Sequence, residues 1–164
     1  MPLTTTTYDA IRDQMATTLH GLTPTLLSNR LFEEHLPKRR RLRDHAAQHP
    51  GEELFRSFEI RRGAATEPGL LDPDAVLRNE TVTVTVAYPT LLALYGTDDL
   101  DEVERLIRGD ARQIRDAVFS AGNYVSGQLA ALPIELDAPD TSDADCYFQE
   151  IAFTAIYYEG QTLT

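Results

Sequence analysis

Segment 80–88 constrains the fold more than any other part of the chain, because its residue types alternate strictly. One set of alternate positions holds valines and a tyrosine, and the other holds threonines and an alanine: Val82, Val84, Val86 and Tyr88 against Thr81, Thr83, Thr85 and Ala87. Successive side chains of a strand point to opposite faces, so the pattern predicts a β-strand with one buried face, ending at Pro89. Such alternation is typical of antiparallel sheets, since strands buried on both faces tend to be apolar throughout.

Segment 99–120 carries the strongest helical pattern. Its apolar residues recur at three-and-four spacing, and charged residues fill other positions: Leu100, Val103, Ile107, Ile114 and Val118 against Glu102, Arg105, Arg108, Arg112 and Arg115. This predicts an amphipathic helix from Asp99 to about Ser120. Thr97 and the aspartates at 98, 99 and 101 suit its N-terminus, where they cap backbone N–H groups and oppose the helix dipole. A helix start explains these aspartates better than a general acid or base does.

Weaker patterns predict the remaining elements. A first helix is expected from Tyr8 to Leu19, ended by Gly21 in a left-handed cap and by Pro24. The other expected segments are a short strand around Asn29–Glu33, a strand at Leu54–Arg62, a turn-rich connection at Gly63–Pro73, a short apolar piece at Ile134–Leu136 and a closing strand at Tyr147–Glu159. In that closing strand, Ile151, Phe153, Ala155 and Tyr157 share one face.

The order of these elements predicts an α+β fold. We expect a single domain spanning residues 1–164, with an antiparallel or mixed β-sheet of about four strands and two main helices packed on one face. The apolar content of 42% over 164 residues fits one domain with a real core.

Residues 37–51 form an unusually basic insert in an acidic chain. Lys38, Arg39, Arg40, Arg41 and Arg43 crowd together between two prolines, followed by His45 and His49. We expect an exposed loop or a short helix here. The cations have three interpretations: a solvated charge run, a surface for docking on protein, or a contact with nucleic acid. We assign them a partner-binding role, together with Tyr158, which lies opposite the apolar face of the closing strand.

No motif in the chain predicts catalysis. His45 and His49, four residues apart, could share a metal on a helix, but the glutamate of the zinc-peptidase motif is missing and nearby cations oppose a dication. The acidic loop 137–145 lacks the spacing of a calcium site. Ser126 and Cys146 lack the neighbours of a nucleophile, and no glycine-rich phosphate loop is present. We therefore expect a protein that is not an enzyme and has no cofactor and no metal.

Charge and cysteine content narrow the class of partner further. The formal net charge is −11 and the pI is about 4.7, so a nucleic-acid backbone is repelled on average. An acidic surface suits an electropositive partner, or the wall of a passage through which a polyanion slides. A single cysteine, with neither a signal peptide nor an apolar run of spanning length, predicts a protein made in a reducing cytosol and not held in a membrane.

The chain resembles the tail terminator proteins of long-tailed bacteriophages, also called tail-completion or head-to-tail joining proteins. The points of likeness are the N-terminal helix, the strand and proline of Thr81–Pro89, the helix Asp99–Ser120, and the strand Ile151–Tyr158 after a proline-bearing acidic loop. The likeness is one of pattern and size and spans most of the chain. The segment Pro37–Gly51 is longer and more basic than the family pattern.

This resemblance implies a structural virion protein without catalytic residues. It implies a homohexameric ring that caps the finished tail tube, stops its polymerisation and joins the tail to the neck or head. The partners would be sister subunits, the tail tube protein and a neck or connector protein, with DNA passing the lumen without specific binding. The location would be the tail or neck of the virion, after synthesis in the bacterial host cytoplasm. The alternative is a head–tail connector protein of similar fold, and a small metal-dependent enzyme or a nucleic-acid adaptor is less favoured.

Overall fold

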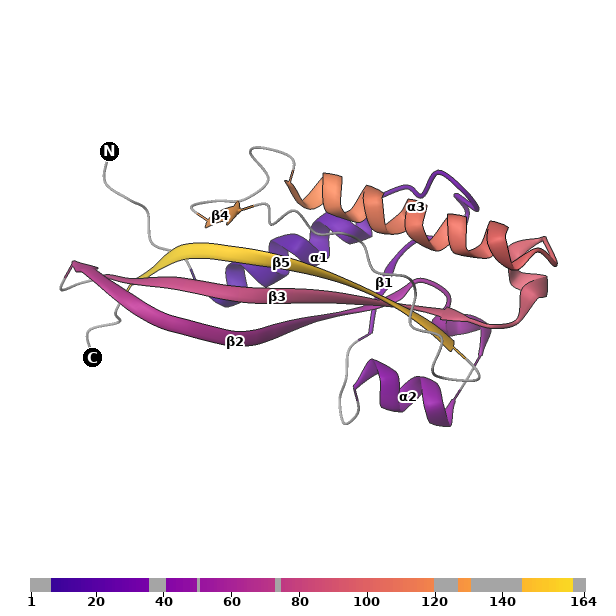
Figure 1. Ribbon diagram of the computed structural model, residues 1–164, viewed down its shortest axis with the longest axis horizontal. Coiled ribbons are helices and arrows are strands. Elements are labelled where there is room, and N and C mark those ends of the chain that lie inside the picture. The colour runs from indigo at the N-terminus through magenta and orange to yellow at the C-terminus, as the bar shows by residue number, and fades with distance from the viewer. Residues whose placement is uncertain are drawn as a thin grey trace.

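The structure, a computed structural model, describes residues 7–35, 41–49, 51–72, 75–119, 127–130 and 146–160. In chain order the elements are α1 (Tyr8–His20), β1 (Glu33–Glu34), α2 (Leu42–Gln48), η1 (Glu52–Leu54), β2 (Ser57–Asp72), β3 (Ala75–Pro89), η2 (Leu92–Tyr95), α3 (Leu100–Phe119), β4 (Gly127–Ala130) and β5 (Cys146–Gly160), where η is a 3₁₀ helix. The strands form one five-stranded mixed sheet in the order β1-β2-β3-β5-β4 (Figure 1). The α+β prediction is confirmed, with five strands where about four were expected.

β3 is the central strand of the sheet. It pairs antiparallel with β2 on one side and β5 on the other. Its register with β5 runs without a shift from Ala75 opposite Gly160 to Pro89 opposite Cys146. The two strands predicted from alternation are therefore confirmed, and β3 begins at Ala75, earlier than the predicted start at Glu80.

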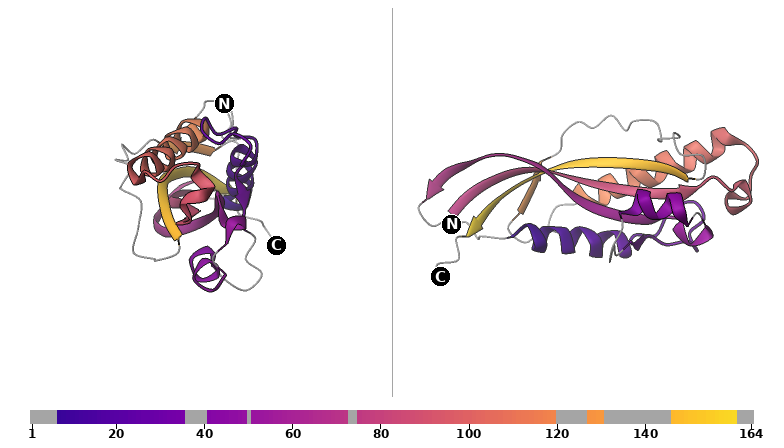
Figure 2. Two further views of the ribbon diagram at one scale, coloured as in Figure 1. Left: turned by 90° about the vertical axis from the view of Figure 1, so that its right-hand side faces the viewer. Right: turned by 90° about the horizontal axis from the view of Figure 1, so that it is seen from below.

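The larger apolar core lies on the sheet face that α1 and α3 cover together (Figures 1 and 2). The predicted inward-facing residues of the two long strands are all buried there: Val82, Val84, Val86, Tyr88, Ile151, Phe153, Ala155 and Tyr157. α3 contributes Val103, Ile107, Ile114 and Val118, and α1 contributes Ile11, Met15 and Leu19. Two helices on one face, as the sequence predicts, thus enclose this core.

The opposite face of the sheet is covered at one end by α2 (Figure 2). A second, smaller apolar cluster forms there from Leu42, Ala46, Leu54, Ala87, Cys146 and Phe148. The basic insert therefore contains the short helix of the two predicted alternatives, and the apolar side of this helix is buried. Residues 36–40 and 50 of the insert lie outside the described part of the chain.

The predicted turn-rich connection Gly63–Pro73 is wrong, because β2 runs on to Asp72. Register shifts between Arg62 and Ala65, and again further along, absorb the irregular residues as β-bulges. At Gly63 an added Cβ would lie 2.8 Å from the carbonyl oxygen of Thr81, so glycine here permits a close approach between strands. Pro68 is tolerated because this length of β2 has no further strand on its outer side within the described residues.

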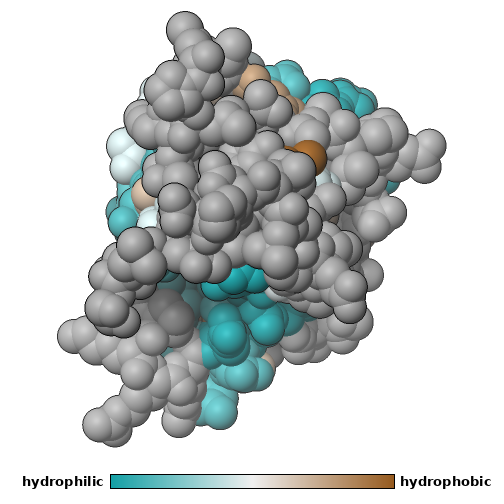
Figure 3. Space-filling model, turned by 90° about the vertical axis from the view of Figure 1, so that its left-hand side faces the viewer, coloured by the Kyte–Doolittle hydropathy of each residue, from teal (hydrophilic) through white to brown (hydrophobic). Residues whose placement is uncertain are grey.

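The long strands project beyond the helices at one end of the molecule, as Figures 1 and 2 show. We call this projecting part of β2, β3 and β5 the arm. Figure 3 views the molecule from the arm end, where the described residues that can be seen are mainly hydrophilic. The arm is therefore a length of sheet without helical cover.

Two smaller predictions need correction, and a third concerns residues outside the described part of the chain. The short strand expected around Asn29–Glu33 is instead β1, Glu33–Glu34, which pairs parallel with the start of β2. Gly21 ends α1 with a φ of −82°, so its cap is right-handed and not left-handed. Ile134–Leu136 lies outside the described residues, and the short strand β4 is found at 127–130.

Candidate partner-binding surfaces and a buried arginine network

The described cations of the basic insert are bound to the protein's own carboxylates. Arg41 lies 3.3 Å from Glu59, which also accepts a hydrogen bond from the backbone N–H of Leu42 at 3.4 Å. Arg43 pairs with Glu150 at 2.9 Å, and its guanidinium lies 4.4 Å from the centre of the Phe148 ring. These contacts hold α2 against β2 and β5. Both arginines therefore have a structural role, although the Arg41 side chain remains 56% exposed.

The other predicted partner-binding residues are Lys38, Arg39, Arg40 and Tyr158. Lys38, Arg39 and Arg40 lie outside the described residues. Tyr158 lies in β5 opposite Leu77, and its side chain is not part of the described structure. The partner-binding role of all these residues remains a prediction.

The two histidines of the predicted metal pair do lie side by side. The ring centroids of His45 and His49 are 5.2 Å apart, and His35 from the segment after β1 lies 5.0 Å from His45. Within the part of the chain that the structure describes, no group of three or more His, Cys, Asp or Glu residues is placed to hold a metal ion. Of the residues considered as nucleophiles, Cys146 is buried in the smaller cluster.

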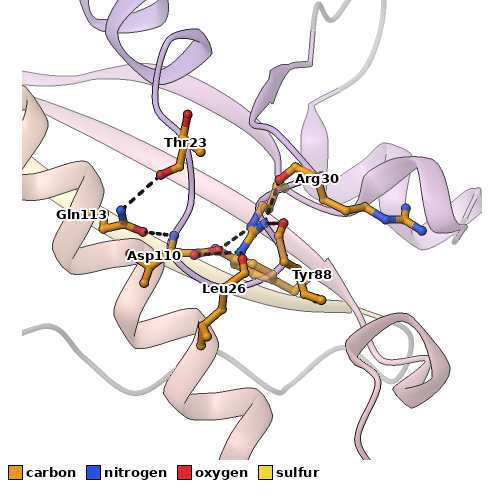
Figure 4. Close-up of polar contacts among 9 residues, drawn as sticks. Thr23, Leu26, Arg30, Tyr88, Asp110 and Gln113 are labelled. Carbon is orange, nitrogen blue, oxygen red and sulfur yellow. Dashed lines mark hydrogen bonds and ion pairs between the residues drawn. The ribbon is translucent and has the colours of Figure 1, made fainter.

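The most elaborate polar arrangement of the described residues surrounds Arg56, which is fully buried just before β2. Figure 4 labels three of its partners, Leu26, Arg30 and Asp110. The Nε and Nη2 of Arg56 donate to the two oxygens of Asp110 at 2.7 and 2.9 Å. Its remaining N–H groups donate to the backbone carbonyls of Leu26, Leu27 and Arg30 at 2.7 to 2.8 Å. Every donor of the guanidinium thus has an acceptor, as a buried cation requires.

The Asp110 carboxylate also binds a tyrosine, and burial raises the pKa of both groups. The Tyr88 hydroxyl donates to Asp110 at 2.9 Å. Burial raises the pKa of Asp110, and the guanidinium of Arg56 opposes the rise. Burial also raises the pKa of Tyr88 well above its usual value, and the charge of Asp110 adds to the rise. The phenol therefore stays protonated and acts as a donor.

Backbone strain is concentrated at the same place. Among the described residues, the non-glycine residues with positive φ are Leu27, at 49°, and Arg56, at 60°. Each such conformation costs on the order of 1 kcal/mol or more. The carbonyl of Leu27 accepts a hydrogen bond from Arg56, so the network holds both strained residues in place.

A second contact fixes the same loop, residues 22–32, to α3. The side-chain oxygen of Gln113 accepts from the N–H of Thr25 at 2.9 Å, and its amide nitrogen donates to the carbonyl of Thr23 at 3.3 Å (Figure 4). Together with the Arg56 contacts, this clamps a loop without regular structure onto the core. The polar network is a structural device that joins the loop, β3 and α3.

The sequence does indicate this network, although it was not predicted above. Asp110 occupies a position of the apolar stripe of α3, between Ile107 and Ile114. Arg56 lies two residues before Phe58 and four before Ile60, two buried apolar residues of β2. A charged residue at a core position of each of two elements is the pattern that predicts a buried ion pair.

The segment between β3 and α3 combines apolar and acidic exposed side chains. Leu91 is 60% exposed and Leu100 is 56% exposed. Between them, Thr97 accepts a hydrogen bond from the N–H of Asp99 at 3.1 Å, and Asp99 accepts one from the N–H of Asp101 at 2.9 Å. The predicted capping role of this acidic group is confirmed for Asp99. We call residues 98–101 the acidic turn.

Comparisons with known proteins do not assign the chain to a family. The chain matches no model of a known protein family, and no curated protein sequence was found to be similar to it. Among the helices of the described residues, none has both the length and the apolar character needed to cross a bilayer.

Proposed function

We propose that the chain is a structural protein of a long-tailed bacteriophage virion, a tail terminator that assembles into a ring on the end of the tail tube. In this proposal the ring stops polymerisation of the tube and presents a surface to the neck or connector. Six copies form the ring in the family that the sequence resembles. The protein turns over no substrate, and DNA passes through an acidic lumen without specific binding.

The observation that carries the proposal is the open edge of β2, which continues along the arm. From Glu59 to Asp72, β2 has β3 on one side and no strand on the other within the described residues. An unpaired strand edge presents a row of N–H and C=O groups, which is a template for pairing with another chain. A heterologous contact of this kind, repeated by rotation, closes a ring.

The buried Arg56 network supports a structural role as well. The only fully buried arginine of the described residues, Arg56, directs every donor at the protein's own acceptors. A reaction centre needs groups that remain available to a substrate. This arrangement therefore suits a rigid subunit of an assembly.

The proposal is tested by imaging and by tube assembly. Negative-stain microscopy and sedimentation velocity of the purified protein, alone and with tail tube protein, are expected to show rings and rings seated on tube ends. Tube protein polymerised with the protein present is expected to give shorter tubes than tube protein alone or with an unrelated protein of similar acidic charge.

Two results would redirect or end the proposal. A protein that remains monomeric both alone and with tube protein contradicts it. A ring that binds the connector protein and leaves tube length unchanged supports the connector alternative instead.

A further inference from the structure

The outer side of α3 carries a row of arginines that the fold does not use. Arg105, Arg108, Arg112 and Arg115 are spaced by three, four and three residues, which places them on one side of the helix, opposite its buried stripe. The first and last lie about 15 Å apart at a rise of about 1.5 Å per residue. We call these four residues the arginine row.

Within the described part of the chain, the ion pairs of two members of the arginine row are with close neighbours on α3. Arg108 lies 3.6 Å from Glu104, and Arg115 lies 3.2 Å from Asp116. Arg105 and Arg112 are exposed and form no ion pair with a described residue. In a chain of net charge −11, two exposed cations on the outer side of a helix, with no ion-pair partner among the described residues, are available to an acidic surface.

Gly109 provides a second, independent observation at the same place. It lies in the middle of α3, and an added Cβ would meet nothing within 4 Å. Its φ is not positive, so neither strain nor crowding within the fold requires glycine there. Glycine weakens a helix interior. The fold itself does not require this glycine, which lies beside Arg105, Arg108 and Arg112. Because it has no side chain, another backbone can approach the helix closely there.

The chain itself contains an acidic surface that fits the row. The acidic turn displays Asp98, Asp99 and Asp101; Leu100 within it is exposed, and so is Leu91 earlier in the same connection. This segment joins β3 to α3, at the end of the molecule opposite the arm (Figure 1). Opposite charges on two separate surfaces of one chain allow one copy to bind the next, and the leucines add apolar contact area to the charged contact.

We propose that the arginine row around Gly109 is the surface on which the acidic turn of a second copy of this chain docks. The inference rests on the proposed function, because head-to-tail repetition of this contact closes the ring. Nucleic acid is the less suitable occupant, since the net charge of the chain repels phosphate.

Charge-reversal variants test the contact. The row variant carries Arg105→Glu and Arg112→Glu, the two positions without an ion pair. The turn variant carries Asp98→Lys and Asp101→Lys, which leave the Asp99 cap in place. Sedimentation velocity, alone and with tube protein, is expected to show association weakened on the order of tenfold or more in each variant. An equal mixture of the two variants is expected to regain wild-type association, because opposite charges then face each other at every contact.

Two substitutions of Gly109 separate an effect on docking from an effect on folding. Gly109→Ala and Gly109→Gln both replace a poor helix former, so both are expected to raise the thermal midpoint. The longer side chain of Gly109→Gln is expected to weaken association several-fold, whereas Gly109→Ala keeps it near wild type. A purely structural role for Gly109 predicts equal association of the two variants.

The outcomes distinguish the contact from the ring. Wild-type association that neither charge variant weakens, or that the mixture does not restore, overturns the contact and leaves the ring proposal standing. An assembly that stops at a dimer and is abolished by charge reversal supports the contact and contradicts the ring. A wild-type protein that is monomeric alone and on tubes overturns both. Binding of DNA by the row, without self-association, overturns the choice of occupant.

Discussion

The two faces of the sheet are held in different ways. The face under α1 and α3 has a large apolar core, and its central ion pair, Arg56 with Asp110, is buried with every guanidinium donor satisfied. The face under α2 has a small cluster, and its ion pairs, Arg41 with Glu59 and Arg43 with Glu150, each have one side chain that is 56% exposed.

The difference shows how burial changes what an arginine contributes. At the surface, water screens the attraction between the two charges and can replace either partner. An exposed ion pair therefore contributes little to the free energy of unfolding. In the core, water cannot replace a lost partner. The remaining charge then stays buried without a counter-charge, which destabilises the folded state strongly. The same residue type is therefore indispensable on one face and replaceable on the other.

Asp110→Ala has the largest expected effect. It leaves the Arg56 guanidinium buried without its counter-charge and removes the acceptor of Tyr88. We expect a loss of about 3–5 kcal/mol in the free energy of unfolding, measured by urea denaturation. Glu104→Ala, on the outer side of the same helix, serves as the control and should cost less than about 1 kcal/mol. Equal losses in the two variants would mean that burial does not decide how much an ion pair contributes to stability.

Leu42→Ala tests the apolar half of the α2 face. Leu42 is fully buried, and its truncation is expected to cost about 2 kcal/mol, the low end for such a change, because a short helix can settle into the space. Hydrogen exchange is expected to accelerate in residues 42–48 while the paired strands β3 and β5 keep their protection. Faster exchange in β3 and β5 as well would show that α2 supports the whole sheet.

Arg43→Ala has the smallest expected effect. It removes the ion pair with Glu150 and the contact of the guanidinium with the Phe148 ring. The loss should be about 0.2–1 kcal/mol and should shrink with added salt. A double-mutant cycle with Glu150→Ala isolates the pair, and a coupling above about 2 kcal/mol would contradict the solvated character assigned to this face.

The parts of the fold that could be predicted are those where one periodicity runs without interruption. Val82 to Tyr88, the stripe from Val103 to Val118 and the alternation from Ile151 to Tyr157 each have a single buried side, so β3, α3 and β5 follow from spacing alone. The end of β2 could not be found in this way. Its glycines and proline are typical of turns, and only pairing with β3 makes them bulges of a strand.

The candidate surfaces were harder to predict, because they depend on contacts between distant segments. The cations at 41 and 43 looked available in the sequence, since their partners lie in β2 and β5. The arginines of α3 were recognised only as the polar side of a helix. Their significance depends on Gly109 having open space around it and on the pairing of Arg108 and Arg115, which leaves two cations exposed.

The contacts of Arg56 have a consequence for how the protein opens. Its side chain joins a loop near the N-terminus to a helix in the second half of the chain, and its own N–H donates to the carbonyl of Ala87 in the central strand. None of these segments can separate without exposing a charge in the core. We therefore expect segments far apart in the chain to open as one cooperative unit, in which the irregular loop resists local unfolding as strongly as the sheet beneath it.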